Sequence, residues 1–282
     1  MKLKNKTVII TGGSRGIGKA IADAFAREGA DLFLIARTEL ELEATKKELE
    51  KYGTKIITYA TDVANAANVV NVANVIKEHF EKIDVLINAA GMYGPIGKLE
   101  ELNADEWIQT FAVNIFGTML MCRAFLPMMK KQRTGRIINF AGGGEGAFSR
   151  FTAYVSSKGA VVRFTETLAE EIKDDGILVN AIAPGAVNTA FLEAVLGAGP
   201  EKAGKEFYEK SLYQKEEGGT PPELAAELCV FLASDESAGI TGKVLSAKWD
   251  NWKEFPKHKQ EIAESDVYTF RRIKPQDRNL KW

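Results

Sequence analysis

The chain has 282 residues, of which 45% are hydrophobic and 27% are charged. This composition is typical of a globular protein and excludes a disordered or fibrous chain, and the length is compatible with a single α/β domain. The 37 basic residues nearly balance the 38 acidic ones, so the net charge of -1 provides no field to gather nucleic acid or a membrane surface.

Short β-branched runs alternate with longer amphipathic stretches along the chain. The predicted strands are Thr7–Ile10, Asp31–Ile35, Lys55–Tyr59, Asp84–Ile87, Arg136–Phe140, Ile177–Ile182 and Lys243–Leu245. The predicted helices between them are Ile17–Arg27, Glu39–Lys51, Ala64–Lys82, Ala104–Lys131, Ala153–Asp174 and Pro222–Ala233. Near-continuous apolar strands that alternate with helices predict a Rossmann-like, doubly wound α/β fold, in which a single domain contains a parallel seven-stranded sheet.

The residues that could bind metals or form disulfides are few. Cys122 and Cys229 stand in apolar, helix-like contexts and are expected to be buried free thiols. His79 and His258 are too few and too isolated for a metal site, so no metal is expected. The start of the chain has no apolar run long enough for a signal-peptide core, and no segment approaches about 18 apolar residues. We therefore expect a cytoplasmic protein that does not bind membranes.

Two segments fall outside the alternation of strands and helices. The first, residues 188–217, follows the sixth strand, and ligands of open α/β sheets bind at such strand ends. It is interpreted as a lid of short helices, with an ordinary connecting helix as the alternative. The second, residues 249–282, is an aromatic and charged extension to a 1–248 domain. We hypothesise that Trp249 or Trp252 contacts the lid or crosses a subunit boundary; the alternative is that both cover the edge of the sheet.

A glycine-rich turn, Thr11–Gly18, connects the first predicted strand to the first predicted helix. Glycines let the backbone approach a pyrophosphate closely, and the amides at a helix N-terminus favour an anion. The turn therefore predicts a nucleotide site made by Gly12, Ser14, Arg15, Gly16, Ile17 and Gly18.

The end of the second strand indicates which dinucleotide binds. An NAD site usually has an Asp or Glu there to bond the ribose hydroxyls, but this chain reads Ala36-Arg37-Thr38. Arg37 and Arg15 could together bind a 2′-phosphate, because guanidinium groups bind phosphate well. NADP(H) is therefore favoured over NAD(H), and the alternative is that both arginines are solvated surface residues. Thr38 also begins a capping-box pattern with Glu41, so its hydroxyl could instead cap the helix.

Tyr154 and Lys158 stand four residues apart at the start of the long helix after the fifth strand, and they therefore share one helix face. An ammonium near a phenol favours the phenolate, so Lys158 is expected to lower the pKa of Tyr154 from about 10. Such a phenol can donate a proton to a carbonyl that is being reduced or accept one from an alcohol that is being oxidised.

Together these motifs resemble the short-chain dehydrogenase/reductase family over residues 3–248. The shared residues are Thr11-Gly12-x-x-x-Gly16-x-Gly18, Asp62-Val63, Asn88-Ala89-Ala90-Gly91, Asn114, Tyr154-x-x-x-Lys158 and Pro184-Gly185-x-Val187-x-Thr189. The resemblance implies that Asp62 and Val63 contact the adenine, that Asn88 to Gly91 border the cofactor, and that Pro184 to Thr189 hold its carboxamide. It implies that Lys158 bonds the nicotinamide ribose and that Asn114 holds a water in a proton relay to Lys158. It also implies a small-molecule pocket shaped by Met92, Tyr93 and the lid, and a homotetramer or homodimer.

The chain departs from the family where a serine normally follows the fifth strand and bonds the substrate oxygen. Counting back from Tyr154 gives Ala141 at this position, and counting forward from Asn139 gives Ala141 or Gly142. In one interpretation a backbone N–H, a water, Ser149 or Thr152 replaces the hydroxyl; in another, the glycine run admits a bulky or charged substrate that Glu145 or Arg150 contacts. In a third, the protein is a dinucleotide-binding, catalytically weak regulatory or assembly subunit. The retained Asn114, Tyr154 and Lys158 favour an NADP(H)-dependent oxidoreductase that interconverts a carbonyl and a secondary alcohol.

Overall fold

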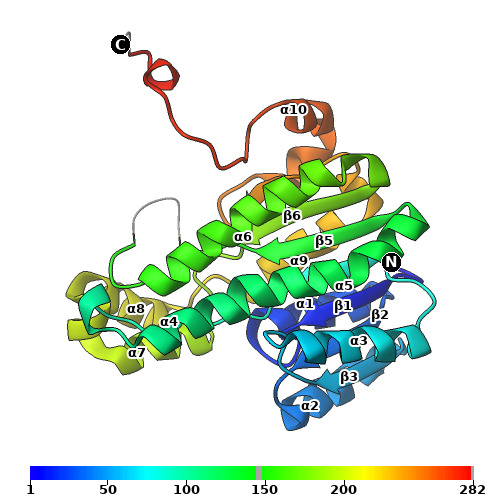
Figure 1. Ribbon diagram of the computed structural model, residues 1–282, viewed down its shortest axis with the longest axis horizontal. Coiled ribbons are helices and arrows are strands. Elements are labelled where there is room, and N and C mark those ends of the chain that lie inside the picture. The colour runs from blue at the N-terminus through cyan, green and yellow to red at the C-terminus, as the bar shows by residue number, and fades with distance from the viewer. Residues whose placement is uncertain (144–147, 281–282) are drawn as a thin grey trace.

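The computed structural model describes residues 1–143 and 148–280 (Figure 1). The expected contact of Glu145 with a substrate lies outside these residues. Within them, a central sheet is covered by helices on both faces, and the chain beyond the last helix runs out from the body to the C-terminus (Figure 1).

Seven parallel strands form one sheet in the order β3-β2-β1-β4-β5-β6-β7. They are β1 (Thr7–Thr11), β2 (Asp31–Ala36), β3 (Ile56–Ala60), β4 (Val85–Asn88), β5 (Gly135–Phe140), β6 (Ile177–Ala183) and β7 (Val244–Ser246). The order reverses at the pair of β1 and β4, where Val8 is in register with Val85 and Thr11 with Asn88. The predicted Rossmann-like sheet is confirmed, and this reversal is the point at which open α/β sheets bind ligands.

Two layers of helices bury the two faces of the sheet. One layer contains α1 (Gly16–Arg27), α2 (Glu39–Leu49) and α9 (Pro222–Ala233), and the other contains α3 (Ala66–His79), α5 (Gly117–Gln132) and α6 (Thr152–Glu171). In β1, Val8 and Ile10 belong to the first core and Ile9 to the second. Successive side chains of a strand point to opposite faces, which is why a continuous apolar run serves both layers.

The predicted helix Ala104–Lys131 is α4 (Ala104–Phe111), a π-helical turn (Ala112–Phe116) and α5 in succession. Among the described residues, Ala104–Gln132 is the one helix that is long and apolar enough to cross a membrane, by length and composition alone. The expectation that no segment approaches about 18 apolar residues did not single out this helix, whose apolar residues are interrupted by Asn114, Thr118 and Arg123. Core helices pass the same test, and α5 buries Met121, Phe125 and Met129 in the core on its side of the sheet.

The two cysteines are buried free thiols, as predicted. Burial raises the pKa of the Cys122 thiol to about 12 and also raises the pKa of Cys229. Neither thiol is therefore activated as a nucleophile.

The chain after β7 packs on α9 and α6. Trp252 is 8% exposed, its ring centroid lies 5.8 Å from that of Phe231 in α9, and its Nε1 donates to Ala247 O at 3.3 Å. A short helix, α10 (Lys259–Glu264), follows, and Phe270 then hydrogen-bonds to Arg163 and Glu166 of α6.

Trp249 is 74% exposed. The buried Trp252 ring belongs to the core between the sheet and α9 and not to the lid, and the contact of Trp249 across a subunit boundary stays a prediction.

Candidate active site

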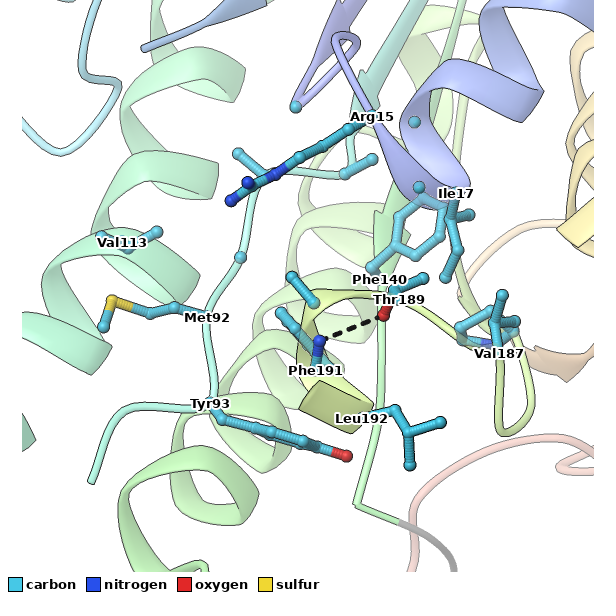
Figure 2. A pocket seen from close by; sticks show the side chains of 18 of the residues that line it. Arg15, Ile17, Met92, Tyr93, Val113, Phe140, Val187, Thr189, Phe191 and Leu192 are labelled. Atoms are coloured by element: carbon cyan, nitrogen blue, oxygen red, sulfur yellow. Dashed lines mark hydrogen bonds between the residues drawn. The ribbon is translucent and has the colours of Figure 1, made fainter. Parts of the chain in front are cut away.

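A cavity of about 450 Å³ opens at the carboxyl ends of the strands, around the reversal between β1 and β4. Part of its lining is shown in Figure 2. The predicted cofactor residues that line it are Gly12, Ser14, Arg15, Gly16, Ile17, Gly18, Arg37, Thr38, Asp62, Val63, Ala89, Ala90, Gly91, Tyr154, Lys158, Pro184, Gly185, Val187 and Thr189. Motifs that are far apart in sequence therefore border one space.

The glycine-rich turn, residues 11–18, forms a concave backbone surface, called the cradle below, which side chains at its glycines would fill. A Cβ at Gly18 would lie 2.1 Å from Gly12 O, and a Cβ at Gly12 would lie 3.0 Å from Ala90 N. Gly12 and Gly16 also have φ angles of 70° and 53°, which favour glycine. No side chain of the described residues caps α1, so its first amides are available to an anion. These residues fit the pyrophosphate of a dinucleotide.

Polar side chains of the glycine-rich turn and of α2 meet beside the end of β2. Ser14 Oγ donates to Glu41 Oε2 at 2.9 Å, and Arg15 Nη1 lies 3.5 Å from Glu41 Oε1. Arg37 and Thr38 are exposed and border the same part of the cavity. The Thr38–Glu41 capping box is not formed: the Thr38 side chain makes no cap, and Glu41 reaches the glycine-rich turn instead. Glu41 thus lines the cavity, whereas its sequence pattern predicted a role in capping the helix.

Helix α6 presents Tyr154 and Lys158 to the cavity, as their spacing predicts. The two residues are 7% and 4% exposed. Lys158 Nζ donates to Phe140 O at 2.8 Å and lies 6.0 Å from the centroid of the Tyr154 ring. Burial lowers the pKa of Lys158 to about 8.

The pKa of Tyr154 moves in the opposite direction to the prediction. Burial raises it, and the neighbouring Tyr93 raises it further. The physical reason for the correction is that the buried phenol loses the water that would stabilise its anion. Tyr154 is therefore a protonated phenol at neutral pH.

Asn114 joins the loop after β4 to α6 and does not line the cavity. Its Oδ1 accepts from Met92 N at 2.9 Å, and its Nδ2 donates to Met92 O and Ser157 Oγ, each at 2.9 Å. This side chain therefore positions the Met92 loop, and the relay water implied by the family resemblance stays a prediction. Asn88 also lies away from the cavity lining, where its Nδ2 donates to Asn139 Oδ1 at 2.9 Å.

Gly142 is the residue that faces the Tyr154 hydroxyl. A Cβ at Gly142 would lie 2.3 Å from Tyr154 Oη. Ala141 is 5% exposed, packs with Val162 and Ala181 and lines the cavity, whereas Gly142 is not among the described lining residues. Both positions therefore lie near the phenol, and neither Ala141 nor Gly142 carries a hydroxyl.

The side chains proposed to replace the serine hydroxyl are not in the cavity lining. Ser149 is exposed in a turn, and Thr152 Oγ1 accepts from Trp107 Nε1 at 3.3 Å. Arg150, which was expected to contact a substrate, is also absent from the lining among the described residues. None of these three residues borders the cavity in the described part of the chain, and their contact with a substrate stays a prediction.

Aromatic rings surround Tyr154 on the substrate side. The Tyr93 ring is edge-on to Tyr154 with centroids 4.5 Å apart, and the Phe191 ring is 4.5 Å from Tyr93 and 5.8 Å from Tyr154. Phe191 belongs to α7 (Ala190–Ala203), and Phe207 of the next helix, α8 (Lys205–Glu217), also lines the cavity. Figure 2 shows Tyr93, Phe191 and Leu192 around the same space. Residues 188–217 thus contain two helices that wall the cavity, in agreement with a pocket shaped in part by this segment.

Comparison with known proteins agrees with this geometry. Residues 6–197 match the family model described as short chain dehydrogenase. The chain is 37% identical over 257 residues to dehydrogenase/reductase SDR family member 6 of Aquarana catesbeiana, covering 88% of this chain and 98% of that protein.

Two solved structures share the fold closely. NAD⁺-bound xylitol dehydrogenase has a TM-score of 0.80 and 28% identity, with 87% of this chain and 98% of that chain covered. An actinorhodin polyketide ketoreductase with NADPH has a TM-score of 0.78 and 29% identity, with 86% and 95% covered. The chain therefore belongs to the short-chain dehydrogenase/reductase family and is an NAD(P)-dependent oxidoreductase that acts on CH–OH groups.

Proposed function

We propose that this protein uses NADP(H) to interconvert a carbonyl and a secondary alcohol, with Tyr154 Oη transferring the proton. The observation that carries the proposal is a single cavity that joins the glycine-rich cradle to the buried Tyr154 and Lys158. The nicotinamide group, when bound, supplies or accepts the hydride.

The ionisation of the two buried side chains supports a proton donor. Burial raises the pKa of Tyr154, so its hydroxyl holds a proton at neutral pH and can give it to a carbonyl oxygen. Lys158, with a pKa of about 8, is mainly charged at pH 7 and stabilises the phenolate that remains after the transfer.

The preference for NADP(H) is supported by the charges at the end of β2. Arg15 and Arg37 border the cavity there, and β2 ends at Ala36 without an acidic residue. The solved relatives contain NAD⁺ in one case and NADPH in the other, so the preference rests on these two guanidinium groups.

The lining of the substrate side favours an uncharged small molecule with an apolar group next to its carbonyl. The side chains that α7 and α8 contribute are all apolar or neutral: Phe191, Leu192, Val195, Phe207, Ser211 and Gln214. The aromatic contacts around Tyr154 suit a flat or ring-bearing carbonyl compound.

The test is calorimetric titration of the protein with NADPH and NADH, followed by a screen of carbonyl compounds that follows the absorbance of the reduced cofactor. Tyr154→Phe should keep cofactor affinity and lose about 10²- to 10⁴-fold in turnover. Binding without turnover of any compound would instead support a regulatory or assembly subunit, the alternative that the missing hydroxyl at Gly142 favours.

We also propose a homodimer or homotetramer, as expected for the family. Two large apolar side chains on the α4 helix and the π-helical turn, Ile108 and Phe116, are 58% and 49% exposed in the single chain. Light scattering on the purified protein measures the assembly directly, and a monomer at micromolar concentration would contradict this expectation.

A further inference from the structure

Helix α2 is attached to the glycine-rich turn through two residues on one of its faces. Thr45 Oγ1 donates to Ser14 O at 2.9 Å, and Glu41, four residues earlier, accepts from Ser14 Oγ at 2.9 Å. Ser14 is 7% exposed and Thr45 is fully buried. Both the backbone and the side chain of Ser14 are therefore held by α2.

Glu41 also pairs with the arginine of the same turn. Arg15 Nη1 lies 3.5 Å from Glu41 Oε1, and the two side chains are 63% and 37% exposed. An ion pair with this exposure is weak and exchanges readily with other ions. Ser14, Arg15 and Glu41 all line the cavity, at the end where the adenosine ribose is proposed to bind.

Glu41 thus contacts Arg15, one of the two arginines proposed to bind a 2′-phosphate, and Ser14 beside it. We propose that Glu41 reduces the preference of this protein for NADP(H) by competing with the 2′-phosphate for Ser14 and Arg15. A bound 2′-phosphate must take Arg15 from the carboxylate and then lie close to that carboxylate, and the two anions repel each other. A ribose with a free 2′-hydroxyl adds no charge, so Glu41 weakens the binding of NADP(H) more than that of NAD(H).

The inference rests on the proposed dinucleotide site but not on turnover. A rival role for Glu41 is to accept a hydrogen bond from the ribose 2′-hydroxyl, as the acidic residue of an NAD site does. The two roles predict opposite effects. Removing a competitor strengthens the binding of the phosphorylated nucleotide, whereas removing an acceptor weakens the binding of the unphosphorylated one.

The experiment is calorimetric titration of the full chain with adenosine 2′,5′-bisphosphate and with AMP, which differ only in the 2′-phosphate. The variant is Glu41→Gln, which keeps the shape of the side chain and an acceptor for Ser14 but removes the charge. The matched control is Glu43→Gln on the same helix, because Glu43 pairs with Thr58 and Lys46 and does not line the cavity. Thermal unfolding of all variants checks that the fold is kept.

We expect Glu41→Gln to bind the bisphosphate about 3- to 10-fold more tightly than the wild type, with AMP binding unchanged within about twofold. Glu43→Gln should change neither affinity. In an Arg15→Gln background the gain should become smaller, because the competition for Arg15 is lost while the repulsion between Glu41 and the phosphate remains.

An unchanged affinity for the bisphosphate, or a loss of AMP affinity, would overturn the inference while leaving the dinucleotide site in place. A wild type that binds neither nucleotide would overturn the proposed dinucleotide function and this inference with it.

Discussion

Gly142 offers the sharpest test of how this active site works without the family's serine. We predict that Gly142→Ser raises turnover above that of Gly142→Ala, because the serine supplies a second hydroxyl beside Tyr154. The backbone at Gly142 is outside the left-handed region, so it accepts a side chain without strain in φ.

The structure gives the size of the perturbation. A Cβ at residue 142 would lie 2.3 Å from Oη, 3.0 Å from Cζ and 3.3 Å from Cε1 of Tyr154. The phenol must withdraw by about 1 Å to restore ordinary contact. Overpacking of this kind costs about 1–3 kcal/mol in unfolding free energy, and both variants bear it equally. The difference between them therefore isolates the hydroxyl.

One donor to a developing oxyanion changes kcat by about 10²- to 10³-fold. We accordingly expect kcat of Gly142→Ser to exceed that of Gly142→Ala by roughly 10²-fold. The assay follows NADPH absorbance with the best carbonyl compound of the screen, and calorimetry confirms equal cofactor affinity. Ala141→Ser is the companion variant, because Ala141 also lines the cavity, and a larger gain there would place the missing hydroxyl at position 141 instead. Equal kcat for the two Gly142 variants, at unchanged cofactor affinity, would refute the reasoning.

Three further predictions concern the cradle, the buried lysine and the C-terminal extension. Gly18→Ala should abolish dinucleotide binding in calorimetry, because its Cβ would lie 2.1 Å from Gly12 O; retained affinity would mean that the turn adapts. For Lys158→Met, the sign of the change in unfolding free energy follows from the lowered pKa of Lys158. Between about pH 8 and pH 10.5 the unfolded lysine binds more protons than the folded one. The charged, buried Lys158 therefore lowers the unfolding free energy of the wild type below pH 8. The Lys158→Met variant should therefore be more stable than the wild type by about 2 kcal/mol at pH 7, after allowing for the lost hydrogen bond to Phe140. Urea titrations should show this gain in unfolding free energy vanish towards pH 10.5, and a gain independent of pH would contradict the reasoning. Trp252→Ala should lower the unfolding free energy by about 3 kcal/mol, because it empties a buried contact with Phe231, whereas Trp249→Ala, at an exposed ring, should change it by less than about 0.5 kcal/mol.

The sheet and the cradle could be predicted because their signals are local and periodic. An apolar run such as Thr7–Ile10 predicts a buried strand because both faces of the sheet are covered by helices. The glycines from Gly12 to Gly18 form a turn within one short stretch of sequence, so their spacing alone predicts it. The cavity lining followed from these, since the carboxyl ends of parallel strands meet at one edge.

The errors share a different physical origin. Glu41 fits a capping box by its spacing, and only the folded chain shows that Ser14 and Arg15 lie within its reach. The pKa of Tyr154 was inferred from the nearness of a charge, but the direction of its shift depends on burial and on the neighbouring Tyr93, which only the folded chain shows. The choice between Ala141 and Gly142 depends on where the strand ends and which way each Cβ points, which counting cannot supply.

Thr189 is the residue at which the cofactor side and the substrate side of the cavity meet. Its Oγ1 accepts from Phe191 N at 3.3 Å, so it caps the helix that carries Phe191 (Figure 2). A ligand amide that bonded to this hydroxyl in place of Phe191 N would loosen the first turn of α7 and let the Phe191 ring move away from Tyr154. We therefore expect the dinucleotide to bind before the second reactant, and product-inhibition kinetics would test this order.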